Sequence, residues 1–132
     1  MRQVKLKVLV IHEQKHVRRR IYKILCPFDF EFIYAFDGLD GLAAAKYDKP
    51  DLIITDVDLS ILHGLSMAGM LKRDAETTDV PIIFLNNEMD FDYLSQAKDL
   101  DAKGFLMTPY IDNSLACSVR RAINKPLFPS ER

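Results

Sequence analysis

Two aspartates follow a short apolar run near the middle of this chain. Leu52 to Ile54 shows no polar alternation, and Asp56-Val57-Asp58 comes shortly after it. A run without alternation is typical of a strand that is buried on both faces of a parallel sheet. Carboxylates at the carboxyl end of such a strand lie where open α/β sheets bind ligands. Their oxygens suit a hard cation such as Mg²⁺, although Asp56 and Asp58 could instead be turn residues that cap the next element.

Other polar residues follow other apolar runs. The first run ends at His12-Glu13, and two later runs end at Asn86 and Thr108. Because the carboxyl ends of parallel strands meet at one edge of a sheet, we expect all these side chains to converge there. The hypothesis requires Glu13 and Asp56 to lie close enough to bind the same divalent ion.

Strand and helix patterns alternate five times along the chain. The sequence predicts strands at 4–11, 30–36, 52–54, 82–85 and 103–107, and helices at 15–25, 39–47, 64–73, 91–100 and 111–123. Asp112 or Asn113 is expected to cap the last helix. This alternation predicts an α/β fold with helices on both faces of a parallel sheet. Of the doubly wound strand orders, the flavodoxin-like order 2-1-3-4-5 suits five strands and places the ligand crevice between strands one and three.

The composition limits the class of protein. The chain has 132 residues, of which 48% are hydrophobic and 28% charged, so we expect one globular domain. Eighteen basic and nineteen acidic residues give a net charge of -1, which argues against direct nucleic-acid binding. Cys26 and Cys117 lack metal or redox spacing and are expected to be free thiols in a reducing compartment. No apolar run approaches the roughly 20 residues needed to span a bilayer, so a cytoplasmic location is predicted.

Six segments of the chain stand in a characteristic order: Lys7 to Ile11, Asp37-Gly38, Lys49 to Asp56, Gly64, Val80 to Leu85 and Gly104 to Tyr110. Taken together, they resemble a response-regulator receiver domain, a CheY-like fold. The resemblance extends from about residue 5 to residue 125. We therefore expect a receiver domain at 1–125 and a tail or the start of a linker at 126–132.

The resemblance implies a role for each residue at the predicted edge. Asp56 would accept a phosphoryl group from a phosphohistidine on a partner kinase. Glu13, Asp56 and the backbone carbonyl of Asp58 would bind Mg²⁺, and His12 would contribute only weakly from the outer sphere.

The resemblance also implies contacts to the phosphoryl group and to partners. Asn86 and Thr108 would contact the phosphoryl group, and Phe105 and Tyr110 would form a partner surface. The implied partners are a histidine kinase or phosphotransfer protein and an output effector protein or domain. The chain is expected to be a non-enzymatic module, either a monomer or a weak homodimer.

Four positions depart from the family pattern. His12 replaces an acid and is a poor Mg²⁺ ligand, Asn86 replaces a hydroxyl residue, and Ser60 replaces a proline. Thr108 replaces a lysine, so a charge-assisted contact to the phosphoryl group is lost. Two hypotheses remain open: weak phosphorylation of Asp56, or a pseudo-receiver that binds proteins independently of phosphorylation.

Two other functional classes fit the sequence less well. Asp56-Val57-Asp58 also resembles the paired aspartates of haloacid-dehalogenase-type phosphatases, but that family places the pair after its first strand and needs a longer chain. A flavodoxin-like cofactor site would need a phosphate-binding loop rich in Gly, Ser or Thr after the first strand. Here that position holds His12-Glu13.

Overall fold

Five parallel strands form one sheet in the computed structural model, which describes residues 5–123. The strands are β1 (Lys7–Ile11), β2 (Glu31–Ala35), β3 (Leu52–Asp56), β4 (Ile82–Asn86) and β5 (Gly104–Met107). Their order is β2-β1-β3-β4-β5, which confirms the predicted fold class and topology. The tail or linker expected at 126–132 lies outside the described residues.

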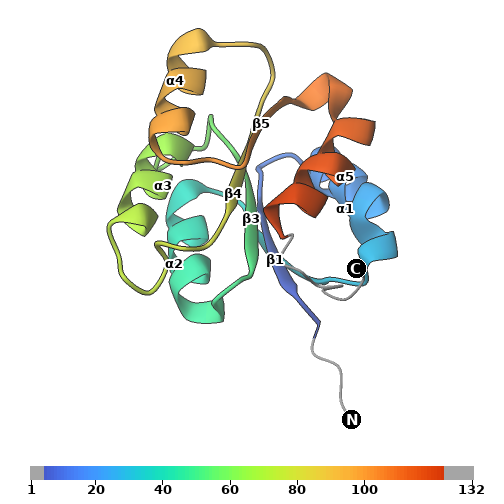
Figure 1. Ribbon diagram of the computed structural model, residues 1–132, viewed down its shortest axis with the longest axis horizontal. Helices are drawn as coiled ribbons and strands as arrows, with labels where there is room; N and C mark the ends of the chain where they lie inside the picture. Colours follow the sequence, from blue (N-terminus) through green and yellow to red (C-terminus); the bar gives the residue numbers. More distant parts are fainter. Residues whose placement is uncertain (1–4, 124–132) are drawn as a thin grey trace, which may run out of the picture.

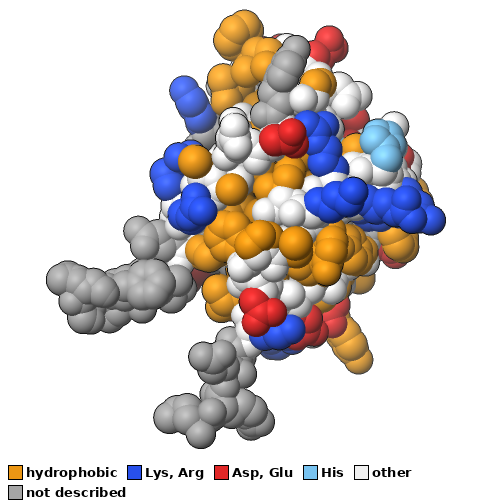
Figure 2. All heavy atoms as spheres, turned by 90° about the vertical axis from the view of Figure 1, so that its right-hand side faces the viewer, with side chains coloured by type: hydrophobic (Ala, Val, Ile, Leu, Met, Phe, Trp, Pro, Cys, Tyr) orange, Lys and Arg blue, Asp and Glu red, His pale blue; other side chains and the backbone are white. Residues whose placement is uncertain are grey.

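Helices cover both faces of this sheet. They are α1 (Lys15–Leu25), α2 (Gly38–Asp48), α3 (Gly64–Lys72), α4 (Phe91–Asp99) and α5 (Ile111–Ala122). Figure 1 shows α1 and α5 on one face and α2, α3 and α4 on the other. Figure 2 turns the α1 and α5 side toward the viewer, where hydrophobic side chains are visible among charged ones. Within residues 5–123, no helix combines the length and apolar character needed to cross a membrane.

The central strands are apolar because both of their faces are buried. Val8 and Val10 of β1 belong to the core beneath α1 and α5, whereas Leu9 and Ile11 belong to the core beneath α2, α3 and α4. All four side chains are inaccessible to solvent. The same burial explains why Leu52 to Ile54 lacks polar alternation.

The strand register brings the carboxyl ends of the strands to one level. Ile11 pairs with Thr55, Asp56 pairs with Leu85, and Asn86 pairs with Met107. His12 directly follows Ile11, so it reaches the sheet edge beside Asp56. The predicted convergence of these strand ends therefore follows from parallel pairing.

The last helix begins at Ile111, as the sequence pattern predicted, but without the expected side-chain cap. A 3-10 turn at Thr108–Tyr110 leads directly into α5, so Asp112 and Asn113 lie inside the helix. The expected capping role for these two residues is therefore wrong. Asp112 instead forms an ion pair with Arg20 of α1 at 2.7 Å, which links the two helices on this face.

Gly64 allows α3 to start directly against the end of β3. A Cβ atom at this position would lie 2.3 Å from the backbone oxygen of Asp56 and 3.0 Å from the Cα of Val57. Real Cβ atoms do not approach backbone atoms so closely. The absence of a side chain at residue 64 therefore determines where the loop after Asp56 can run.

We predict that Gly64→Ala destabilises the protein by about 1–3 kcal/mol, because the backbone that follows Asp56 must move to make room. Gly69→Ala in the same helix is the matched control, since its Cβ would meet nothing closer than Arg73 Nη1 at 3.5 Å. The control should raise stability by about 0.5–1 kcal/mol. Urea unfolding measures both changes, and equal effects of the two substitutions would refute this account of Gly64.

Candidate functional site

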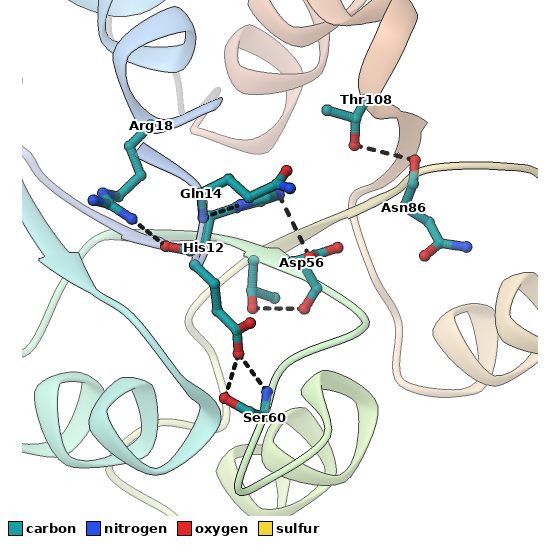
Figure 3. A network of polar contacts seen from close by, with 9 residues as sticks. His12, Gln14, Arg18, Asp56, Ser60, Asn86 and Thr108 are labelled. Atoms are coloured by element: carbon teal, nitrogen blue, oxygen red, sulfur yellow. Dashed lines mark hydrogen bonds and ion pairs between the residues drawn. The ribbon is translucent and has the colours of Figure 1, made fainter. Parts of the chain in front are cut away.

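Asp56 and His12 lie side by side at the carboxyl edge of the sheet. Asp56 is the last residue of β3, and its side chain is 15% exposed. His12 follows β1 and is 2% exposed, and its backbone N–H donates to the carbonyl of Ala35 at the end of β2. The Nε2 atom of His12 lies 3.4 Å from Oδ2 of Asp56 (Figure 3). The acidic residue at this edge therefore has a buried imidazole as its direct neighbour.

The hydrogen bonds of His12 determine which ring nitrogen carries the proton. The backbone N–H of Gln14 donates to Nδ1 of His12 at 3.1 Å (Figure 3). Nδ1 is therefore the acceptor, and in the neutral ring the proton resides on Nε2. Among the described residues, Nε2 has no partner with hydrogen-bond geometry. The site thus contains a buried N–H donor that faces Asp56 and is not satisfied by it.

The surroundings of Asp56 disfavour its charge. Burial, followed by the negative charge of Asp58, raises the pKa of Asp56 from 3.8 to about 6. The backbone N–H groups of Asp58 and Val57 act in the opposite direction, and Glu13 adds a further repulsion. Asp56 is therefore ionised at neutral pH, at an electrostatic cost that a nearby cation would relieve.

Burial also keeps His12 neutral. It lowers the pKa of His12 to about 4, and the positive charges of Arg18 and His16 act in the same direction. The distance between His12 and Asp56 would suit an ion pair, but a neutral imidazole cannot form one. At neutral pH the contact is therefore one between a neutral ring and a carboxylate.

The carboxylate of Glu13 is held by the loop after β3. Its Oε2 atom accepts hydrogen bonds from both the backbone N–H and the hydroxyl of Ser60 (Figure 3). These two bonds lower the pKa of Glu13. Proline has no N–H and no hydroxyl, so the family's usual residue at position 60 could not make either bond. The sequence identified the substitution at Ser60 but not this consequence.

Asn86 and Thr108 are buried, and Thr108 links the end of β5 to the end of β4. The hydroxyl of Thr108 donates to the backbone carbonyl of Asn86 at 3.2 Å (Figure 3). The amide of Asn86 donates to the backbone carbonyl of Glu88 at 2.8 Å. Both candidate phosphoryl contacts are therefore engaged with backbone in this structure. Their predicted role toward a phosphoryl group stays a prediction.

Asp58 is exposed and lies in a small polar cluster of its own. Nε2 of His63 is 3.6 Å from Oδ1 of Asp58, and the ring of His63 is 5.4 Å from that of Tyr93 in α4. The negative charge of Asp58 raises the pKa of Tyr93. Neither His63 nor Tyr93 belongs to a motif that predicts a functional role. No sequence pattern places α4 beside the loop after β3, so this cluster could not be predicted from the sequence.

The proposed partner surface is only partly described. Phe105 is half-buried and packs against the core beneath α2, α3 and α4. The backbone of Tyr110 belongs to the turn before α5, and its side chain lies outside the described part of the structure. The role of both residues in binding partners therefore stays a prediction.

The residues around Asp56 fit Mg²⁺ in the kind of donor they offer. The repulsion of Asp56 by Asp58 and Glu13 shows that negative charge gathers here, and Mg²⁺ is often bound through one or two carboxylates and several waters. Metal binding by Glu13 would compete with its hydrogen bonds from Ser60. Within residues 5–123, no group of three or more His, Cys, Asp or Glu side chains is arranged to hold a metal. A metal would therefore need water or backbone ligands in addition to Asp56 and Glu13.

Comparison with known proteins agrees with this geometry. The family model of the response regulator receiver domain matches residues 8–120. The chain belongs to this family. As a receiver domain it is part of two-component signalling, and domains of this family are generally signalling modules rather than enzymes. The resemblance stated from the sequence is confirmed.

Individual relatives differ in how much of their length this chain covers. The chain is 26% identical over 119 residues to the probable transcriptional regulator ycf27 of Porphyridium aerugineum, covering 90% of this chain and 48% of that protein. It is 22% identical over 117 residues to protein PilH of Pseudomonas aeruginosa, covering 89% of this chain and 97% of that protein. The chain therefore spans about half the length of ycf27 but nearly all of PilH.

Solved structures confirm the fold. The chemotaxis response regulator CheY4 of Vibrio cholerae superposes with a TM-score of 0.81 at 24% identity, covering 90% of this chain and 99% of that one. A receiver domain protein from Clostridium thermocellum superposes with a TM-score of 0.80 at 25% identity, covering 90% and 94%. The backbone arrangement of this receiver domain is thus shared at low sequence identity.

The raised pKa of Asp56 predicts a pH-dependent stability difference from Asp56→Asn. The folded receiver domain holds the Asp56 proton more tightly than the unfolded chain, so this group stabilises the fold below about pH 4 and loses that effect as the pH rises through about 6. In EDTA, Asp56→Asn should be more stable than the native chain above pH 6, by up to about 3 kcal/mol, and equally stable near pH 4. Urea unfolding at several pH values measures the difference. The prediction would be contradicted if the native chain were more stable than Asp56→Asn at pH 7.5.

Proposed function

We propose that this receiver domain is a phosphoacceptor module in which Asp56 accepts a phosphoryl group, weakly, from a histidine kinase or a phosphotransfer protein. The observation that carries the proposal is the position of Asp56. It is a partly exposed carboxylate at the carboxyl edge of the sheet, near two further acidic residues, Asp58 and Glu13. We also propose a cytoplasmic location and an output effector protein or domain as the second partner.

The proposed transfer is a displacement at phosphorus. A carboxylate oxygen of Asp56 forms the new P–O bond while the P–N bond to the partner's histidine breaks, and the electron pair of that bond stays with the imidazole nitrogen. A bound Mg²⁺ would supply positive charge that neutralises the phosphoryl oxygens during this step. On this chain, Asp56, Glu13 and the backbone carbonyl of Asp58 would hold the ion. The pKa of Asp56, although raised to about 6, still lies below neutral pH, so the carboxylate is ionised and nucleophilic there.

The proposal assigns His12 a function that differs from that of the acid it replaces. Its buried Nε2–H faces Asp56 and lacks a partner with hydrogen-bond geometry among the described residues. A phosphoryl oxygen on Asp56 is a strong acceptor, and it would satisfy this donor. His12 would then supply one neutral hydrogen bond near the phosphoryl group, while Thr108 offers only a hydroxyl in place of the family's lysine. A neutral donor is roughly half as strong as a charged one, which is why we expect weak retention.

Adduct formation tests the proposed function. We predict that acetyl phosphate with Mg²⁺ adds one phosphoryl group to the chain by intact mass, and that beryllofluoride with Mg²⁺ shifts the NMR signals around Asp56. Asp56→Asn should abolish both responses. Asp58→Asn is the matched control, and it should keep the adduct because only the backbone carbonyl of that residue is needed.

The opposite outcome would select the second hypothesis. An absent adduct, together with spectra that do not change when Mg²⁺ is titrated, would overturn the phosphoacceptor proposal in favour of a pseudo-receiver. An adduct that persists in Asp56→Asn would show that another residue is modified.

Substitutions can strengthen or remove the hydrogen-bond donors that we expect to contact the phosphoryl group. We predict that Thr108→Lys raises beryllofluoride affinity about tenfold, because a charged donor adds roughly 1.4 kcal/mol over a neutral one. His12→Leu, which removes the Nε2–H at similar volume, should weaken beryllofluoride binding about fivefold. Thermal unfolding checks that both variants remain folded. Unchanged affinity in both folded variants would show that neither position affects the phosphoryl group.

A further inference from the structure

A second surface feature lies beside the phosphoacceptor edge, between α1 and the outer strand β2. It is a groove of about 800 Å³ whose lining we call the basic-aromatic groove. Three aromatic rings and six potentially basic side chains line it: Tyr22, Tyr34, Phe36, Lys15, His16, Arg18, Arg19, Arg20 and Lys23. Its shape and composition are not explained by the chemistry of Asp56.

Helical spacing creates one wall of the groove. Lys15, Arg18, Arg19 and Tyr22 are three or four residues apart, so they share one face of α1. The buried residues of α1, among them Val17, occupy a different face that packs on the sheet. The basic wall is therefore a separate stripe of the helix and not the edge of the core.

Aromatic side chains form the other wall. Tyr34 and Phe36 come from the end of β2 and the residue after it, and they are 38% and 50% exposed. The ring of Tyr34 stacks on Phe32 with centroids 6.2 Å apart, and Phe32 meets Tyr22 edge-on at 5.1 Å. β2 is an outermost strand of the sheet, so within residues 5–123 no further strand lies beside its outer edge. The rings are therefore not flanked by side chains of another strand on that side.

Positive charge in the groove is mostly uncompensated. Among the described residues that line it, none is acidic. Arg20 pairs with Asp112, but no carboxylate within residues 5–123 lies at ion-pair distance from Lys15, Arg19 or Lys23. Arg18 donates to the backbone carbonyl of His12 at 2.7 Å and lies 4.5 Å above the ring of Phe36. Figure 2 shows Lys and Arg side chains beside hydrophobic ones on this side of the molecule.

We propose that the basic-aromatic groove is a docking site for an acidic segment of a protein partner that also carries leucine or phenylalanine side chains. The cations would pair with carboxylates, and the rings of Tyr22, Tyr34 and Phe36 would bury the apolar side chains. A nucleic acid suits the surface less well, because the chain as a whole has a net charge of -1 and lacks the basic excess that nucleic-acid binders carry.

Binding of a designed probe tests the proposal. The probe is a fluorescein-labelled peptide in which aspartate and glutamate alternate with leucine and phenylalanine, and anisotropy reports its binding to the full chain. We expect saturable binding that weakens as salt increases. Arg19→Glu and Tyr34→Ser should each weaken it at least about fivefold, because one reverses a charge and the other removes an apolar contact.

Matched controls distinguish binding in this groove from non-specific binding to the protein surface. Lys98→Glu reverses an exposed charge on α4, and Tyr47→Ser removes an exposed ring on α2, both on the opposite face of the sheet. Neither should change the affinity by more than about twofold. A peptide with lysine in place of its acidic residues should not bind.

Three results would overturn the proposal. They are no saturable binding of the acidic peptide, equal losses in the groove and control variants, or tighter binding of a labelled single-stranded oligonucleotide than of the peptide. The last result would identify the groove as a nucleic-acid surface. Phosphorylation of Asp56 is not needed for any of these measurements, so the result is independent of the proposed function.

Discussion

The register between β1 and β3 is the constraint on which the site depends. Parallel hydrogen bonding sets Ile11 beside Thr55, so the next residues, His12 and Asp56, reach the carboxyl edge together. A shift of one residue would turn each side chain of a strand to the opposite face of the sheet. Such a shift would move Val8 and Leu9 into each other's cores and separate the two residues at the edge. The packing of both apolar faces therefore also preserves the geometry of the site.

The electrostatics of the edge are unfavourable in the absence of a cation. Asp56 is partly buried, and Asp58 and Glu13 add negative charge around it. The neighbouring His12 is kept neutral by burial and does not compensate this charge. Ser60 holds the carboxylate of Glu13 through two hydrogen bonds. Proteins often retain such locally unfavourable arrangements where they bind ligands, and this edge is where we propose the phosphoacceptor chemistry.

Helix α1 connects the two surfaces described above. Arg18 donates to the backbone of His12, at the edge that holds Asp56, and its guanidinium also lies over Phe36 in the basic-aromatic groove. Arg20 pairs with Asp112 and joins α1 to α5. Arg18 and Arg20, which stand two residues apart on α1, thus make different contacts. Only the packing of α1 against its neighbours distinguishes them.

The sequence by itself determined the order of the elements, the parallel sheet and the placement of Asp56 and Glu13 at strand ends. These features depend on local patterns: apolar runs without alternation, helical spacing, and breaks at Gly and Pro. The capping residue of α5 was wrongly predicted, because a 3-10 turn leads directly into the helix and places Asp112 and Asn113 inside it. Tertiary structure alone decided the proton position on His12, the capture of Glu13 by Ser60 and the groove between α1 and β2. The contact between Ser60 and Glu13 and the groove both depend on distances between groups far apart in the chain, about which local patterns carry no information. The proton position on His12 depends on the folded turn that brings the backbone N–H of Gln14 to Nδ1.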